Sequence, residues 1–94
     1  MTLETQMYDG ELAKQILENK VFGQVFEDIE SELVNEWKSS KSAAERENLH
    51  LNLTTLDKFK QRLIATLETG KLAQREIEHK RSLFEKLVKQ RQYE

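Results

Sequence analysis

The residues best suited to chemistry in this sequence are Glu76 and His79, which form a Glu-x-x-His pair. A carboxylate and an imidazole three residues apart lie on one side of a helix, and carboxylate-bridged di-iron bundles use this spacing. A complete site would need further inward carboxylates, for which Glu30, Glu45 and Glu47 are the candidates. With 17 acidic residues in the chain, however, such a pair is expected by chance on a solvated helix face. We therefore predict no metal site.

Other patterns that would indicate catalysis are missing from the sequence. It contains no cysteine, no glycine-rich phosphate-binding loop and no nucleophile elbow. His50 lies between two leucines and lacks the paired spacing of a zinc site. A small helical hairpin also offers no concave pocket for a substrate. We therefore expect a protein that is not an enzyme and has no cofactor.

Composition limits the fold to one small, all-α domain. The 94 residues are 37% hydrophobic and 34% charged, which is typical of a folded chain with a thin core. There is no proline and there are only three glycines, so few positions can break a helix. No apolar run approaches the roughly 20 residues of a membrane span, and the N-terminus does not resemble a secretory signal. These features predict synthesis in the cytoplasm and no membrane partner.

Two apolar stripes with helical spacing mirror each other about the polar segment 39–42. They predict a long antiparallel helical hairpin with helices at about 10–39 and 43–69. The mirror register places Leu12 opposite Gly70. The residues of the two stripes are Leu12, Ile16, Phe22, Phe26, Ile29 and Leu33 before the turn, and Leu49, Leu53, Leu56, Lys60, Leu63 and Leu67 after it.

Capping signals set the expected ends of these helices. Residues 1–8 have no apolar period and are expected to form a flexible tail, with Asp9 as the N-cap of the first helix. The hairpin domain would then cover residues 9–70. Ser42 and Glu45 match a capping box, so the second helix should begin at Ala43. The first helix has weak spots at Asn19-Lys20 and Gly23, where it would kink or divide.

Residues 71–94 form a C-terminal arm that the mirrored stripes leave without a partner. The arm should be helical at about 71–92, and it carries seven basic and four acidic residues. Two alternatives follow from Gly70: the second helix continues through it, or it bends there and the arm folds back as a third helix. In either case the arm's apolar residues need a covering surface. The candidate partner-binding residues are Lys80, Arg81, Phe84, Leu87, Val88, Lys89 and Arg91.

Charge and size favour self-association. Residues 1–36 hold nine acidic and two basic residues, whereas residues 37–94 hold eight acidic and thirteen basic residues. These opposite charges can pair within the hairpin or between identical subunits. A two-helix unit seldom buries enough apolar surface to be stable alone, so we expect a homo-oligomer, either a dimeric four-helix bundle or a larger assembly.

The pattern as a whole resembles short helical proteins encoded among the head and packaging genes of tailed bacteriophages. The resemblance covers about residues 10–75, although similar chains often have proline where this one has Lys20. It rests on Leu17-Glu18-Asn19-Lys20-Val21-Phe22, on Phe26 with the acidic run to Trp37, and on Arg46-Glu47-Asn48-Leu49-His50-Leu51, Leu56-Asp57 and Thr69-Gly70-Lys71-Leu72-Ala73.

The resemblance implies a role in virion assembly, in the host cytoplasm or associated with the virion. The first hypothesis is a non-enzymatic adaptor that contacts itself and a larger phage structural or packaging protein. The alternative is a DNA-packaging component resembling a small terminase subunit, although acidic residues interrupt the basic arm and make DNA the less favoured partner. A small inhibitor of a host protein is a third alternative.

Overall fold

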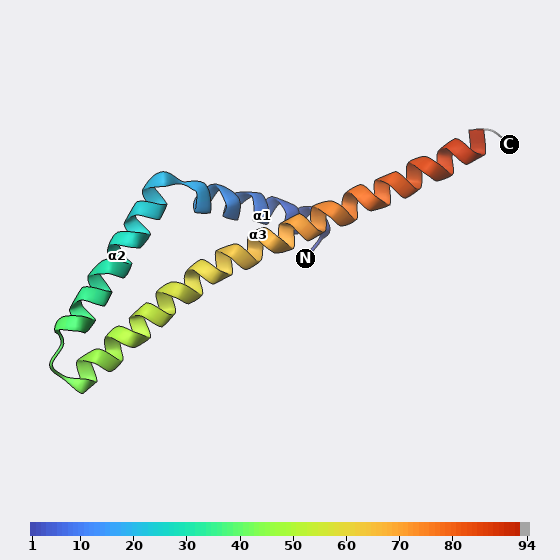
Figure 1. The fold of residues 1–94 in the computed structure, drawn as a ribbon. Helices are drawn as coiled ribbons and strands as arrows, with labels where there is room; N and C mark the ends of the chain where they lie inside the picture. The colour runs from blue at the N-terminus through green and yellow to red at the C-terminus, as the bar shows by residue number, and fades with distance from the viewer. Residues whose placement is uncertain (93–94) are drawn as a thin grey trace.

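The chain folds into three helices and no strand over residues 1–92, the part that the computed structural model describes; side chains are described for residues 1–90. The helices are α1 (Leu3–Glu18), α2 (Lys20–Ser39) and α3 (Ala43–Gln92). In Figure 1, α1 and α2 lie along the first part of α3, which then projects well beyond them. The described chain measures 80 × 25 × 16 Å. The all-α prediction is confirmed, and the molecule is elongated.

Helix α1 begins earlier than expected. Thr2 is its N-cap, and the Thr2 hydroxyl accepts a hydrogen bond from the backbone N–H of Thr5 at 3.1 Å. The predicted start at Asp9 is wrong, and residues 3–8, expected to belong to a flexible tail, are helical. Threonine is a favoured N-cap residue, because its side-chain oxygen accepts from a free N–H of the first turn. The half-buried Leu3 then gives the added turns a packing contact that single-helix periodicity does not reveal.

Asn19 ends α1 and begins α2. Its backbone is extended, with φ −68° and ψ 122°, and its side-chain oxygen accepts a hydrogen bond from the N–H of Phe22 at 2.9 Å. Figure 1 shows the chain bending between α1 and α2. The weak spot expected at Asn19-Lys20 is thus a real helix boundary, because the asparagine serves as C-cap for one helix and N-cap for the next. Gly23 lies inside α2.

A three-residue turn connects α2 and α3. The Ser42 hydroxyl accepts a hydrogen bond from the N–H of Glu45 at 3.4 Å, which confirms the predicted start of the helix at Ala43. The Arg46 Nε donates to the carbonyl oxygen of Ser40 at 3.0 Å, and Ser40 is buried. These bonds hold the chain reversal that places α2 beside the first part of α3.

Of the two alternatives at Gly70, the structure shows continuation. Helix α3 runs unbroken through Gly70 for 50 residues, and no glycine has a positive φ. The arm is therefore the end of α3 rather than a third helix folded back on the hairpin.

The core is thin. No side chain in the described part of the chain is fully buried, and the buried hydrophobic residues are Ala13, Phe26, Leu49 and Ala73. The accessible surface is 7985 Å², whereas a globular monomer of 11.1 kDa exposes about 5,700 Å². This chain therefore leaves much more surface in water than a compact fold of its size.

Candidate functional site

Helices α1 and α3 cross at two glycines. A Cβ atom built on Gly70 would lie 2.7 Å from the Cα of Gly10, and one built on Gly10 would lie 2.7 Å from the Cα of Gly70. The nearby Ala13 and Ala73 are only 3% and 2% exposed. With hydrogen or methyl groups at these positions, the two backbones meet directly. The predicted pairing of Leu12 with Gly70 is wrong, because Gly10 occupies that place.

The crossing joins two copies of one sequence pattern. Gly-x-Leu-Ala occurs at residues 10–13 and again at 70–73, and apolar residues flank both copies at matching positions. The matching sets are Leu3, Met7, Gly10, Ala13 and Leu17 on α1 and Leu63, Leu67, Gly70, Ala73 and Ile77 on α3. The spacing of large apolar residues does not predict this register, because glycine and alanine make the contacts at the crossing. The repeated tetrapeptide was the signal that could have found it.

The α3 residues at this crossing belong to a longer apolar stripe with alternating three- and four-residue spacing, as in coiled-coil helices. We call it the α3 stripe. Where this three- and four-residue spacing falls on a polar residue, as at Asn52 and Lys80, the stripe is interrupted. Its apolar and small members are Leu49, Leu56, Phe59, Leu63, Gly70, Ala73, Ile77, Phe84 and Leu87.

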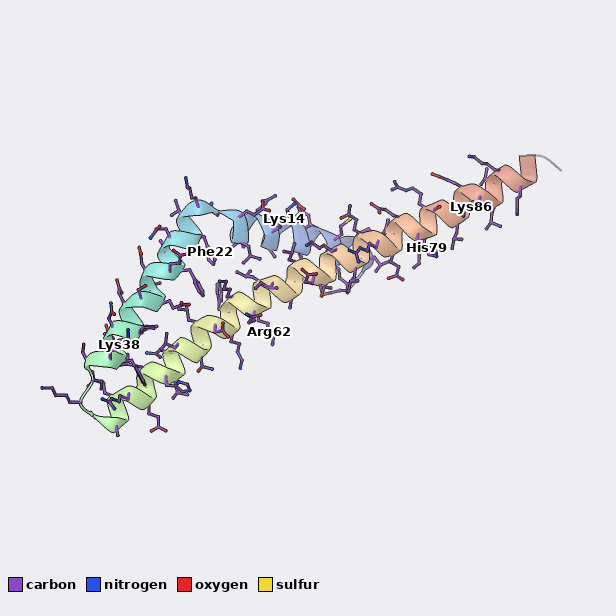
Figure 2. All side chains as sticks on the ribbon, viewed as in Figure 1. Lys14, Phe22, Lys38, Arg62, His79 and Lys86 are labelled. Carbon is purple, nitrogen blue, oxygen red and sulfur yellow. The ribbon has the colours of Figure 1, made fainter. Side chains whose placement is uncertain are left out.

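The α3 stripe continues past the end of α1 without a covering helix. Phe84 is 66% exposed and Leu87 is 60% exposed, and Val88 is also exposed. Phe84 and Val88 lie next to Glu85 and Lys89 on one exposed surface of this segment. Figure 2 shows His79 and Lys86 on this projecting part of α3, with no other helix beside them.

The structure places the charged candidate residues on the same projecting segment. Lys80 forms an ion pair with Glu76 at 3.6 Å between two exposed side chains, so the pair contributes little to stability. Arg81 and Lys89 are exposed. The backbone of Arg91 belongs to α3, but its side chain lies outside the described residues. The candidate residues thus share one helix segment, where apolar and basic groups alternate.

Aromatic residues lie between the beginning of α2 and the facing part of α3. The ring centroids of Phe22 and Phe59 are 6.3 Å apart, and those of Phe22 and Phe26 are 6.1 Å apart. The Lys60 ammonium lies 5.5 Å from the centroid of the Phe26 ring, within the range of a cation–π interaction. Figure 2 shows Phe22 pointing from α2 towards α3.

A shallow groove opens beside this aromatic contact, where α2 and α3 run next to each other. We call it the α2–α3 groove. Its apolar lining is accessible, since Ile29 and Phe59 are both exposed. Its lining residues are Ile29, Leu33, Asn52, Thr55, Leu56 and Phe59.

Among the described residues, no ion pair joins the acidic side chains of α2 to α3. Both ion pairs found among the described residues, Glu68 with Lys71 and Glu76 with Lys80, lie within α3. Helix α2 carries five acidic and two basic residues and therefore a formal charge of −3. The predicted charge pairing within the hairpin thus appears in no ion pair between α2 and α3 in that part of the chain.

The pair Glu76 and His79 lies on the projecting part of α3, where Glu76 contacts Lys80. Over the described residues, no three His, Cys, Asp or Glu side chains gather as a metal site would require. None of the helices there has the length and apolarity to cross a membrane.

Comparisons of this chain with models of protein families, with curated proteins and with solved structures found no match.

Proposed function

We propose that this protein is a non-enzymatic helical adaptor, which oligomerises and binds a larger protein through uncovered helix faces. The observation that carries this proposal is the exposure of the α3 stripe: α1 covers the stripe around Gly70, but no described residue covers it around Phe84 and Leu87. A short helix without packing is marginal in water, because most helical stability in proteins comes from tertiary contacts. A partner helix or surface at this segment would supply those contacts.

The setting that we propose is a tailed bacteriophage, on the resemblance of residues 10–75 described above. In this proposal the partner is a larger structural or packaging protein, and the adaptor acts during virion assembly in the host cytoplasm or remains with the virion. The shape supports such a role, because the hairpin and the basic arm lie at opposite ends of a rod 80 Å long, which can bridge two components.

Light scattering of the full chain as a function of concentration tests the proposal. We expect the wild type to oligomerise, and Leu87→Ser to weaken this association. Leu51→Ser is the matched control, because Leu51 is 58% exposed on the same helix but lies outside the arm. A wild-type protein that stays monomeric at high micromolar concentration would contradict the oligomeric adaptor.

A DNA-packaging component is the second candidate, supported by the exposed basic residues Lys80, Arg81, Lys86 and Lys89 on the arm. Basic side chains displace counterions from the phosphate backbone, so binding of this kind falls steeply with salt. Fluorescence anisotropy with labelled duplex DNA at physiological salt separates the two hypotheses. The adaptor predicts no binding, whereas the packaging component predicts a ring that loses DNA when these four residues are replaced by glutamine. Inhibition of a host protein is the third hypothesis.

A further inference from the structure

We infer that the occupant of the exposed α3 stripe is a second copy of this chain, whose α2–α3 groove receives the arm. This inference rests on the proposed adaptor function and goes further by naming the partner, the surface and the orientation. The two surfaces are the apolar residues Phe84, Leu87 and Val88 of one copy and the groove around Ile29 and Phe59 of the next.

The arm cannot reach the groove of its own chain. Both surfaces involve α3, which is one continuous helix from Ala43 to Gln92. Phe84 and Leu56 are therefore held about 42 Å apart along the helix axis. Figure 1 shows this separation, with α2 beside the start of α3 and the arm at its far end. An arm that fills such a groove has to come from another molecule.

The two surfaces continue an interface that already exists within the chain. At the crossing, the α3 stripe binds a helix, since α1 packs on it at Gly70 and Ala73. The same stripe is exposed on either side of the crossing. Towards the turn, Phe59 stays exposed although Phe22 of α2 contacts it, and towards the C-terminus Phe84 is exposed. Packing between these two exposed parts would extend helix-on-helix contact along the whole of α3.

Charge complementarity supports this pairing. The arm, residues 71–94, has a formal charge of +3, and α2 has a formal charge of −3. The acidic charge of α2 is not neutralised by an ion pair with α3 among the described residues. A partner's arm beside α2 would bring the two opposite charges together.

The order of residues along the two helices sets the orientation. On α2, Ile29 is followed on the same face by Glu32 and Glu36, whereas Phe84 on the arm is preceded by Lys80 and Arg81. An antiparallel arrangement of the arm and the partner's α2, with Phe84 at Ile29, puts the basic pair next to the acidic pair. The parallel arrangement would put the basic pair beside Val25 instead.

Antiparallel docking implies a head-to-tail assembly. Helix α2 runs opposite to the first part of α3, so an arm antiparallel to the partner's α2 runs parallel to the partner's α3. Two parallel copies displaced along their axes are not related by a two-fold axis. Such heterologous contacts continue from copy to copy and give either a ring or an open chain.

The exposed surface is large enough for two such contacts. This chain exposes 7985 Å², against about 5,700 Å² for a compact monomer of its mass. A stable interface of ordinary size covers about 800 Å² on each partner. Each copy in a head-to-tail assembly makes one contact with its arm and another with its groove.

A mixing experiment tests the inference. The arm variant combines Phe84→Glu with Leu87→Glu, and the groove variant combines Ile29→Lys with Thr55→Lys, all at exposed positions. We expect the wild type to form species larger than dimers in sedimentation velocity, and each variant alone to weaken self-association at least about tenfold. The mixture should form a one-to-one complex, because the groove of one variant and the arm of the other are intact.

The possible results separate this inference from the proposed function. A groove variant that assembles like the wild type, or a mixture without a complex, would overturn the pairing of arm and groove and leave the adaptor intact. A wild type that stops at a dimer would overturn the head-to-tail arrangement. A monomeric wild type at high micromolar concentration would overturn both proposals.

Disulfide trapping provides a second measurement that avoids disruptive charges. The chain has no cysteine, so single cysteines report specific contacts. Under oxidation, a mixture of Val25→Cys and Val88→Cys should form a cross-linked pair, because antiparallel docking brings these exposed residues together. Lys86→Cys in place of Val88→Cys is the control, since residue 86 lies about 200° around the helix from Phe84, whereas Val88 lies on nearly the same side as Phe84. Equal cross-linking of both mixtures would contradict the proposed register.

Discussion

At the scale of single residues, the missing side chains of Gly10 and Gly70 decide how α1 meets α3. Their Cα atoms approach so closely that an added Cβ would lie 2.7 Å from the facing backbone. Backbone atoms cannot move aside as a flexible side chain can. The two glycines are therefore required by a close approach between helices, not by a turn.

Gly70→Ala should destabilise the protein even though alanine favours helix. We expect a loss of about 1–3 kcal/mol from overpacking at the crossing, reduced by about 1 kcal/mol of gained helix propensity. Gly23→Ala is the control, because nothing lies within 4 Å of an added Cβ there and only the gain in propensity remains. Thermal unfolding followed by circular dichroism measures both. A Gly70→Ala protein as stable as Gly23→Ala would contradict the close crossing.

At the scale of elements, one asparagine divides the first half of the hairpin into two helices. Asn19 bends the chain, and α1 then reaches the α3 stripe at the glycine crossing while α2 packs on α3 through Phe22 and Phe26. Its side chain replaces an intrahelical partner for the N–H of Phe22. The cap thus determines where each helix touches α3.

Asn19→Ala should weaken the bend. Losing the cap destabilises the fold by about 1 kcal/mol, and alanine also allows α1 and α2 to join into one helix. Double electron–electron resonance between spin labels at Tyr8 and Asn35 should then show longer distances than in the same labelled protein that keeps Asn19. Asn48→Ala, at an exposed helical position, is the control and should leave the distances unchanged. Unchanged distances in Asn19→Ala would mean that packing alone maintains the bend.

The arm should exchange its amide hydrogens faster than the rest of α3. Helical residues without tertiary contacts open easily, and the side chains of residues 78–90 are all exposed. Hydrogen exchange at low protein concentration should show rapid labelling there and slow labelling at residues 49–60. At high concentration the arm should become protected if a second copy covers it. If the exchange rate of the arm does not change with protein concentration, a second copy does not cover the arm.

At the scale of the whole molecule, the fold is an open rod with little interior. The radius of gyration is 21.7 Å, against about 12 Å for a compact chain of this length. Surface charge is also divided between acidic α2 and the basic arm. Association through these two regions would respond to ionic strength.

Raising sodium chloride from about 0.1 M to about 1 M should weaken self-association several-fold, because the Debye length falls from about 10 Å to about 3 Å. Sedimentation velocity at both salt concentrations measures the change. The arm variant is the control, since its self-association is already weakened and should change less with salt, while its helix content should stay constant. Association that strengthens with salt would indicate that apolar contact, rather than charge pairing, selects the partner.

The sequence by itself determined the local structure of this protein. The absence of proline, the apolar periodicity and the Ser42 capping box predict the all-α class, the turn and the start of α3 at Ala43. Asn19 could be predicted as a weak point because its capping chemistry is local. The candidate residues of the arm could also be predicted locally, because the sequence alone shows an apolar stripe that has no matching stripe elsewhere in the chain.

Only the tertiary structure decided how the helices meet. Gly70 allows both a bend and a continuous helix, and the structure shows that it lies within α3, where Gly10 of α1 approaches it. The helical turns before Asp9 also lie against a distant part of α3, since an added Cβ on Gly70 would meet the carbonyl oxygen of Gln6. Periodicity locates large apolar side chains and gives no weight to glycine or alanine. Contacts made by backbones, through residues far apart in the chain, therefore lie outside what a local pattern can predict.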